Sequence, residues 1–345
     1  MGFPRFAVSS IATWLAIAAI CAQAPATAQD VEPLDEVVVS GEYPGPGLWK
    51  ITRPNDTAGH VMWIVGEPPP LPKRMKWKSK DIEAVALGAQ EILLDSAVRM
   101  DTDEKIGFFT GLTLLPAIYE ARRNPDDAKL EDVLPAPLYA RWLVQKELYL
   151  GRERGVESWR PLFAANKLLK AAYKDLKLRE SGVIWEAIGK LAEKHKIKVT
   201  APVKKYTIRR GDVRTKLKEF SRESLPDVEC FATMVALTEA LADRDLQNAR
   251  AHAWAIGDYE ALARFPALPS PFLPCAMAVL SSQVAREVVP ADIRQQVHAL
   301  WLEAAEKSLA QNSTTFAIVP FVKLTRSGGY LEMLRDKGYL VEAPP

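Results

Sequence analysis

The sequence predicts an α/β fold with a mixed or mostly parallel central sheet, built from two similar halves with a large helical insertion between them. Short apolar runs at 61–65 (VMWIV), 91–98 (EILLDSAV) and 314–322 (TTFAIVPFV) are typical of buried strands. The region from about 103 to 265 instead carries apolar residues three or four positions apart, which favours helices. No short-period repeat of the solenoid kind is present. Two strand-rich ends therefore flank a helical middle.

The chain begins with the features of a secretory signal peptide. Arg5 supplies a positive charge, IATWLAIAAI forms a short apolar stretch, and ATA at residues 26–28 fits a cleavage site. We expect residues 1–28 to be removed near Ala28, which gives a periplasmic or secreted protein. Its net charge is then +1, because the full chain carries +2 and the leader contains one arginine and no acid.

The mature chain is predicted to contain a linker and one domain. Residues 29–47 are rich in proline, glycine and acidic side chains, which indicates a disordered linker, and 48–345 are expected to form a single domain. No later segment approaches the ~20 apolar residues of a spanning helix, so we expect no membrane span. The nearly neutral charge gives no general attraction to nucleic acid, and we expect no nucleic-acid partner.

The first half of the domain has the pattern of a hairpin followed by a βαβ unit. The segment LWKITR (48–53) and the run at 61–65 are separated by turn residues, and a turn is expected at Gly66. Ser79 is a candidate N-cap for a helix whose apolar face is formed by Ile82, Val85, Ala86 and Ala89. With EILLDSAV as a single buried parallel strand, the unit has a right-handed crossover.

The second half mirrors this organisation after the helical insertion. Within the insertion, IKVTAPV (197–203) is predicted as a short strand, and PALPSPFLP (266–274) follows the insertion as a proline-rich break. A long amphipathic helix follows, with Pro290 near its start. The run at 314–322 is then a buried strand, GGYLEMLRDKG a short helix, and YLVEA a closing strand.

Two cysteines remain after the leader is removed, Cys230 and Cys275. In an oxidising compartment they can form a disulfide, and the alternative is two buried thiols. Their separation of 45 residues fits no zinc site. The sequence leaves both interpretations open.

The usual catalytic motifs are absent. The four histidines, at positions 60, 195, 252 and 298, fall into no metal-ligand pairing. No G-x-S-x-G nucleophile elbow and no phosphate-binding G-x-x-x-x-G-K loop occurs. We therefore interpret each histidine as a surface or packed side chain.

Two basic stretches are candidate binding segments, KRMKWKSK (73–80) and KKYTIRRGDVRTKLK (204–218). Their interleaved aromatic residues allow stacking on a sugar ring or a nucleic-acid base. The alternative is a solvated charged face, which the nearly neutral chain favours. The candidate binding residues are Lys73, Arg74, Trp77, Tyr206, Arg209 and Arg210.

The two ends of the mature chain resemble the TraB/GumN family, which is similar to Tiki-type metalloproteases and more remotely to erythromycin-esterase-like hydrolases. At the opening, Leu48–Trp49–Lys50, Trp77–Lys78–Ser79 and Asp95 match in type the family's L-W-K strand, its helix start and its strand-ending acid. At the far end, 301–342 resembles the closing helix, strand and G-Y-x-V unit. The resemblance spans 48–341, and the helical middle fits it loosely.

The departures from the family pattern decide the functional expectation. The resemblance implies two G-x-x-H motifs just beyond strands, whose histidines share a metal. Here the first motif reads Gly66–Glu67–Pro68–Pro69 and the second Pro320–Phe321–Val322–Lys323. Proline cannot ligate through its side chain, and a protonated lysine repels a metal ion. Of the family's polar residues, Asp95 remains.

We therefore expect no cofactor, and we expect Asp95 to pair with Lys323 across the former cleft. The degenerate site consists of Gly66, Glu67, Pro69, Asp95, Pro320 and Lys323. The alternative is a divalent metal held by Asp95, Glu67 and a histidine such as His298.

The leading hypothesis is a non-catalytic binding or interaction protein of the cell envelope, with an unknown protein or glycan partner. One alternative is a metal-dependent hydrolase or peptidase with an altered site. Another is a periplasmic glycan- or exopolysaccharide-binding protein, which rests on the association of such family members with exopolysaccharide gene clusters. The sequence leaves open whether the chain is an enzyme and favours a binding role.

Overall fold

The computed structural model describes residues 45–68, 70–105, 108–179 and 182–344. The predicted signal peptide, most of the predicted linker and Pro69 lie outside the described residues. Within those four ranges, no helix combines the length and the apolar character that crossing a membrane requires.

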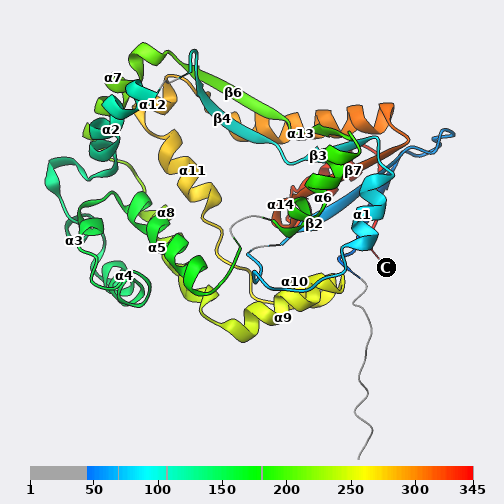
Figure 1. Cartoon of the computed structure of the whole chain (residues 1–345), viewed down its shortest axis with the longest axis horizontal. Helices are drawn as coiled ribbons and strands as arrows, with labels where there is room; N and C mark the ends of the chain where they lie inside the picture. The colour runs from blue at the N-terminus through cyan, green and yellow to red at the C-terminus, as the bar shows by residue number, and fades with distance from the viewer. Residues whose placement is uncertain (1–44, 69, 106–107, 180–181, 345) are drawn as a thin grey trace, which may run out of the picture. The chain divides into compact units, whose positions relative to one another are not determined.

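The main sheet has six strands, in the order β5-β3-β7-β2-β1-β8. In Figure 1 its strands β2, β3 and β7 lie at the right of the view, and the helices α2, α3 and α4 at the left. The strands β5, β3, β7 and β2 pair in parallel, while β1 is antiparallel to both of its neighbours. The mixed, mostly parallel sheet and the β1–β2 hairpin are therefore confirmed. The strand bounds are β1 Trp49–Thr52, β2 Val61–Glu67, β3 Glu91–Leu94, β5 Lys198–Thr200, β7 Thr314–Pro320 and β8 Leu340–Glu342.

Helices cover both faces of this sheet. Successive side chains of its central strands therefore point alternately into two apolar clusters, one on each face. Ile64 and Val319 pack with α13 (Ile293–Gln311) on one face, around the fully buried Trp301. Val65 and Ile318 point to the other face, where α1, α6, α9 and α10 contribute to the cluster. Burial on two faces explains why these strands are continuously apolar.

A third apolar cluster lies in the helical middle, between α4, α5, α8 and α11, with Trp142, Leu168 and Phe231 fully buried. The helices before α13 are α1 Lys80–Leu87, α2 Phe108–Arg122, α3 Leu130–Val133, α4 Ala136–Tyr149, α5 Pro161–Asp175, α6 Val183–Lys194, α7 Val213–Arg222, α8 Val228–Leu241, α9 Arg244–Ala255, α10 Tyr259–Arg264, α11 Phe272–Leu280 and α12 Gln283–Arg286. Two short helices follow β7, α14 Phe321–Thr325 and α15 Tyr330–Asp336.

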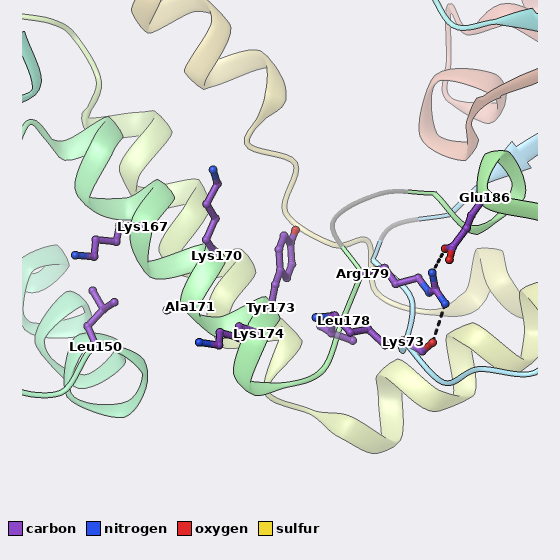
Figure 2. A pocket seen from close by; sticks show the side chains of 10 residues that line it. All are labelled: Lys73, Leu150, Lys167, Lys170, Ala171, Tyr173, Lys174, Leu178, Arg179 and Glu186. Atoms are coloured by element: carbon purple, nitrogen blue, oxygen red, sulfur yellow. Dashed lines mark hydrogen bonds and ion pairs between the residues drawn. The ribbon is translucent and has the colours of Figure 1, made fainter. Parts of the chain in front are cut away.

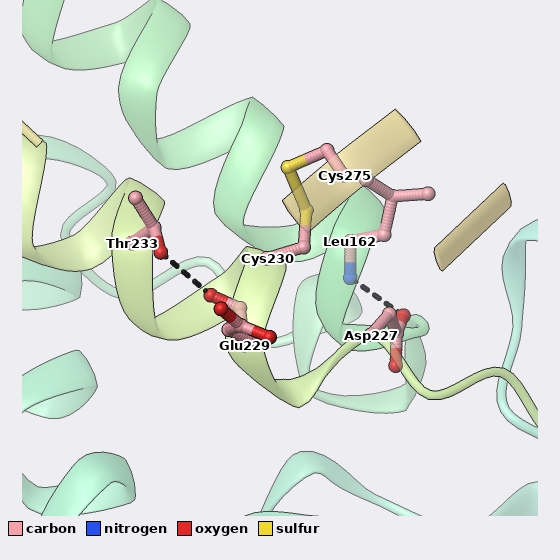
Figure 3. Close-up of a disulfide and its surroundings, with 6 residues drawn as sticks. All are labelled: Leu162, Asp227, Glu229, Cys230, Thr233 and Cys275. Atoms are coloured by element: carbon pink, nitrogen blue, oxygen red, sulfur yellow. Dashed lines mark hydrogen bonds between the residues drawn. A yellow bond between two sulfur atoms is a disulfide. The ribbon is translucent and has the colours of Figure 1, made fainter. Parts of the chain in front are cut away.

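A disulfide joins Cys230 of α8 to Cys275 of α11, with the two Cα atoms 4.6 Å apart. The structure thus decides between the two interpretations that the sequence left open. Figure 3 shows the bridge close to Asp227, which accepts a hydrogen bond of 2.9 Å from the Leu162 backbone N–H of α5. Closing a loop of 45 residues stabilises the fold by about 4 kcal/mol in the chain-entropy model.

The prediction that EILLDSAV forms one strand is wrong. β3 ends at Leu94, and Ala97–Thr102 form a separate strand, β4, which pairs in parallel with β6 (Val203–Ile208). Asp95 and Ser96 lie between the two strands, and their polar side chains bind groups outside the sheet. IKVTAPV is divided in the same way, since β5 ends before Pro202 and β6 begins after it.

Two further predictions about prolines need correction. The proline-rich break at 266–274 is too long, because its last three residues begin α11, where Pro274 sits in the first turn and needs no hydrogen-bonded N–H. The strand predicted at 314–322 ends at Pro320, and Phe321 and Val322 belong to α14.

Glu91, at the start of β3, is a buried carboxylate that connects three elements. It accepts hydrogen bonds from Ser308 of α13 (2.9 Å), from Asn312 (2.8 Å) and from Thr200 of β5. Lys198 lies 3.0 Å away. Burial alone would raise the pKa of Glu91, but these donors outweigh it and lower the pKa below its usual value. The charged form therefore holds β3 to β5 and to the end of α13.

We predict that Glu91→Ala lowers the free energy of unfolding at pH 7 by roughly 2–4 kcal/mol, because it leaves buried donors without an acceptor. A lowered pKa stabilises the fold above the unfolded pKa of about 4.5, and this contribution is lost as the pH falls through the folded value. The gap between wild type and variant should therefore shrink below pH 4.5. Urea unfolding at pH 7 and pH 3.5 measures both effects.

The control is Glu342→Ala, which removes the exposed partner of Lys50 on the same sheet. That change should cost less than about 1 kcal/mol. A Glu91 variant no weaker than this control, or equally weakened at both pH values, would contradict the role given to the buried carboxylate.

Candidate functional site

Three parallel strands end at one edge of the sheet, and the degenerate motif residues lie at these ends. Glu67 is the last residue of β2 and pairs in register with Pro320, the last residue of β7. Asp95 follows β3 directly, and Lys323 lies in α14, directly after β7. Carboxyl ends of parallel strands are where open α/β sheets place their ligands. The predicted positions therefore share one edge.

The centre of this edge is an ion pair between the two residues that were expected to pair. Lys323 Nζ lies 2.6 Å from Asp95 Oδ2. The hydroxyl of Tyr330, at the start of α15, donates a hydrogen bond of 2.8 Å to Asp95 Oδ1. Both charged side chains are at most one-fifth exposed, at 13% for Lys323 and 20% for Asp95. Each carboxylate oxygen of Asp95 thus has its own partner.

Aromatic packing holds Tyr330 in this position. Its ring stacks on Trp301 of α13, with the ring centres 3.9 Å apart and the planes 18° from parallel. Burial, and then the negative charge of Asp95, raise the pKa of Tyr330 well above its usual value. Its hydroxyl therefore stays protonated and remains a donor to Asp95.

His298, one turn before Trp301 on α13, makes an edge-to-face contact with the Tyr330 ring, with the ring centres 5.9 Å apart. Its Nε2 is 2.9 Å from Nη2 of Arg326. Burial, followed by the charges of Arg326 and Lys323, lowers the pKa of His298. The neutral ring of His298 therefore accepts, at Nε2, a hydrogen bond from the Arg326 guanidinium.

The carboxylate of Glu67 caps the start of α6. It accepts a hydrogen bond of 3.0 Å from the Ile184 backbone N–H. Burial raises the pKa of Glu67, and the N–H groups of Ile184 and Trp185 oppose that shift. A Cβ atom at Gly182 would lie 1.9 Å from the carboxylate oxygens, so this contact requires a glycine there. Glu67 is a helix cap supplied by a distant strand.

Gly66 is not in a turn, contrary to the prediction, since β2 continues through it and it pairs with Val319. A Cβ atom here would lie 2.9 Å from a ring carbon of Phe321, the first residue of α14. The Gly66 carbonyl accepts a hydrogen bond of 3.0 Å from the Trp254 indole. The absence of a side chain at Gly66 thus lets α14 pack closely on β2, while the Gly66 carbonyl binds Trp254 of α9.

The residues present do not fit the shared metal that the family resemblance implies. Among the described residues, no group of three or more His, Cys, Asp or Glu side chains is placed to hold a metal ion. Pro69, in the first histidine position, lies outside those residues. Lys323, in the second, brings a positive charge to Asp95, and the other carboxylate at the strand ends, Glu67, caps α6. A catalytic metal needs about three protein ligands and an open position.

The candidate binding residues of the first basic stretch lie in different environments. Lys73 lines a cavity of about 850 Å³, and Arg74 lines another of about 310 Å³. Trp77 is partly buried and packs against Trp254 of α9, with the ring centres 5.5 Å apart.

The second basic stretch lies on β6, in the turn after it and on the first half of α7. The hydroxyl of Tyr206 is buried and has no hydrogen-bond partner. Arg209 is exposed. Arg210 forms an ion pair of 3.0 Å with Glu104. These three residues therefore lie in different environments: a buried hydroxyl, an exposed side chain and an ion pair.

Sequence reasoning missed Tyr330 and the environment it shares with Trp301. The local signal is the GGY triplet at the start of α15, and from the sequence alone it indicates only where a helix begins. Nothing in that triplet indicates a partner 235 positions away.

Comparison with known proteins gives one family match. The model of the TraB/PrgY/gumN family matches residues 47–343. The chain belongs to this family. No curated protein and no solved structure is significantly similar to it. Family membership covers both ends of the domain and the helical middle, which the sequence resemblance had fitted only loosely.

We predict that Gly182→Ala destabilises this family member by roughly 2 kcal/mol, because the new methyl group displaces the Glu67 carboxylate from the start of α6. Chemical unfolding measures the loss. The matched control is Gly155→Ala, where a Cβ atom meets nothing within 4 Å. Equal stabilities of the two variants would show that the Glu67 cap contributes little.

Proposed function

We propose that this member of the TraB/PrgY/gumN family is non-catalytic and acts by binding or interaction in the cell envelope. The observation that carries the proposal is the full engagement of Asp95. Lys323 holds one of its oxygens and Tyr330 the other. The carboxylate that the resemblance marks as a site residue is therefore used to hold α14 and α15 against the end of β3.

The chemistry of Lys323 argues against metal-dependent hydrolysis at this edge. A protonated lysine offers three donors and no lone pair, so it cannot ligate a metal. Its ammonium also repels any cation that approaches Asp95, and a partly buried position weakens the screening of that repulsion. To become a ligand, Asp95 would have to leave both of its present partners.

The altered hydrolase remains the alternative, and the contacts of its other two residues count against it. The Glu67 carboxylate is bound to the start of α6. Nε2 of His298 faces Arg326. Both groups are therefore held by hydrogen bonds within the fold. A catalytic or metal-binding histidine is instead normally oriented by a carboxylate that accepts from its ring.

The proposed compartment rests on the leader and on the disulfide. Residues 1–28 have the composition of a secretory signal peptide. The Cys230–Cys275 bridge is the kind of bond that persists in an oxidising compartment. Together they support a periplasmic or secreted protein that meets a protein or glycan partner there.

We predict that the unmodified protein binds no stoichiometric zinc, manganese or cobalt, and that Pro69→His combined with Lys323→His creates measurable metal affinity. The second change removes the repelling charge, and both together restore the two imidazole ligands that the family resemblance implies, in addition to Asp95. Each single variant should bind at least ~10-fold more weakly than the double variant, a difference of about 1.4 kcal/mol. Calorimetric titration with each metal measures these affinities.

Lys337→His is the control, because it places an imidazole in an exposed ion pair, with Glu306, away from this edge. It should not increase metal binding. The proposal is overturned by one tightly held transition metal per unmodified chain, lost together with peptidase activity in Asp95→Asn. That result would establish the altered hydrolase.

A further inference from the structure

A basic cavity of about 850 Å³ lies between α5, the segment around Lys73 and the first turn of α6 (Figure 2). It is an open groove, and none of its lining residues belongs to the Asp95 site. The lining residues that carry charge are Lys73, Lys167, Lys170, Lys174, Arg179 and Glu186.

Three lysines of this groove have no carboxylate partner among the described residues. Lys170 and Lys174 are exposed and one helical turn apart on α5, and Lys73 belongs to the facing segment. Two of the nearby acids are already paired. Glu153 binds Lys167, and Glu186 binds Arg179. The groove therefore carries an excess of positive charge in a chain whose total charge is nearly neutral.

The groove is also built to keep this charge in place. Arg179 donates a hydrogen bond of 2.8 Å to the Lys73 carbonyl while its guanidinium pairs with Glu186. The Lys73 backbone N–H donates a hydrogen bond of 2.8 Å to the Lys177 carbonyl, just beyond α5. These bonds fix the Lys73 segment to the end of α5 and to α6.

Between the charges, the groove offers apolar surface from Leu150, Ala171 and Leu178, together with one aromatic residue, Tyr173. A single ring does not provide the series of stacking surfaces that successive nucleic-acid bases use. The groove is bounded by helices and a connecting segment, so an extended peptide finds no strand edge to pair with. A ligand with separated charges and less polar faces between them fits both features.

We propose that this groove binds an acidic oligosaccharide, whose carboxylates contact Lys73, Lys170 and Lys174 and whose sugar rings lie on the apolar surface. Along α5, Lys170 and Lys174 are separated by a rise of about 6 Å, which suits charges separated by uncharged groups. Lysine ammonium groups act as point charges on flexible stems, so they accept carboxylates in several orientations. The proposal goes beyond the loss of catalysis and does not depend on it.

The test is titration of the full mature chain with an oligogalacturonate, beside a neutral oligosaccharide, inorganic polyphosphate and single-stranded DNA. Binding of the oligogalacturonate should weaken at least ~10-fold in Lys170→Gln combined with Lys174→Gln. It should also weaken as salt rises, because the contact is electrostatic.

The matched control is Lys205→Gln combined with Lys218→Gln, which removes the same charge from exposed, unpaired positions on β6 and α7. This control should bind within about twofold of wild type, since its lysines do not line the groove. The proposal is overturned by absent binding, by equal weakening in both double variants, or by polyphosphate or DNA binding as tightly as the oligogalacturonate. Metal titrations of the same proteins report on the Asp95 site separately.

Discussion

The parallel pairing of β7 between β2 and β3 is the constraint on which this architecture depends. β7 follows β3 by more than two hundred residues, yet it pairs with that strand on one side and with β2 on the other. Because the three strands run in the same direction, the residues that follow them meet at one edge. This is how Asp95 and Lys323, 228 positions apart, come within 2.6 Å of each other.

The strand-end positions retain a purpose although their side chains are unsuited to metal chemistry. Gly66 allows α14 to pack on β2, and Glu67 caps α6. Asp95 holds α14 through Lys323 and α15 through Tyr330. Each contact joins the sheet to a helix that covers it. The account is therefore one of a scaffold in which the strand ends serve packing, while binding takes place elsewhere on the domain.

Much of the fold was predictable, because short continuous apolar runs identify strands that are buried on both faces, such as β2 and β7. β4 was not, since its alanine and valine continue the apolar pattern of β3 although Val98 is exposed. Pro320 was ambiguous in another way, because proline both ends a strand and begins a helix. The Asp95–Lys323 pair was predictable only with the family resemblance, which places the two halves face to face. The groove escaped notice because Lys170 and Lys174 look like an ordinary solvated helix face.

A double-mutant cycle on Asp95 and Lys323 tests the central claim most directly, with urea unfolding of wild type, Asp95→Asn, Lys323→Met and the combined variant. If the charge of Asp95 is committed to Lys323, the two changes should be coupled by roughly 1–3 kcal/mol, with the combined variant less destabilised than the sum of the singles. Additive losses, together with stabilisation of the wild type by a divalent transition metal, would show that Asp95 is committed to a metal instead.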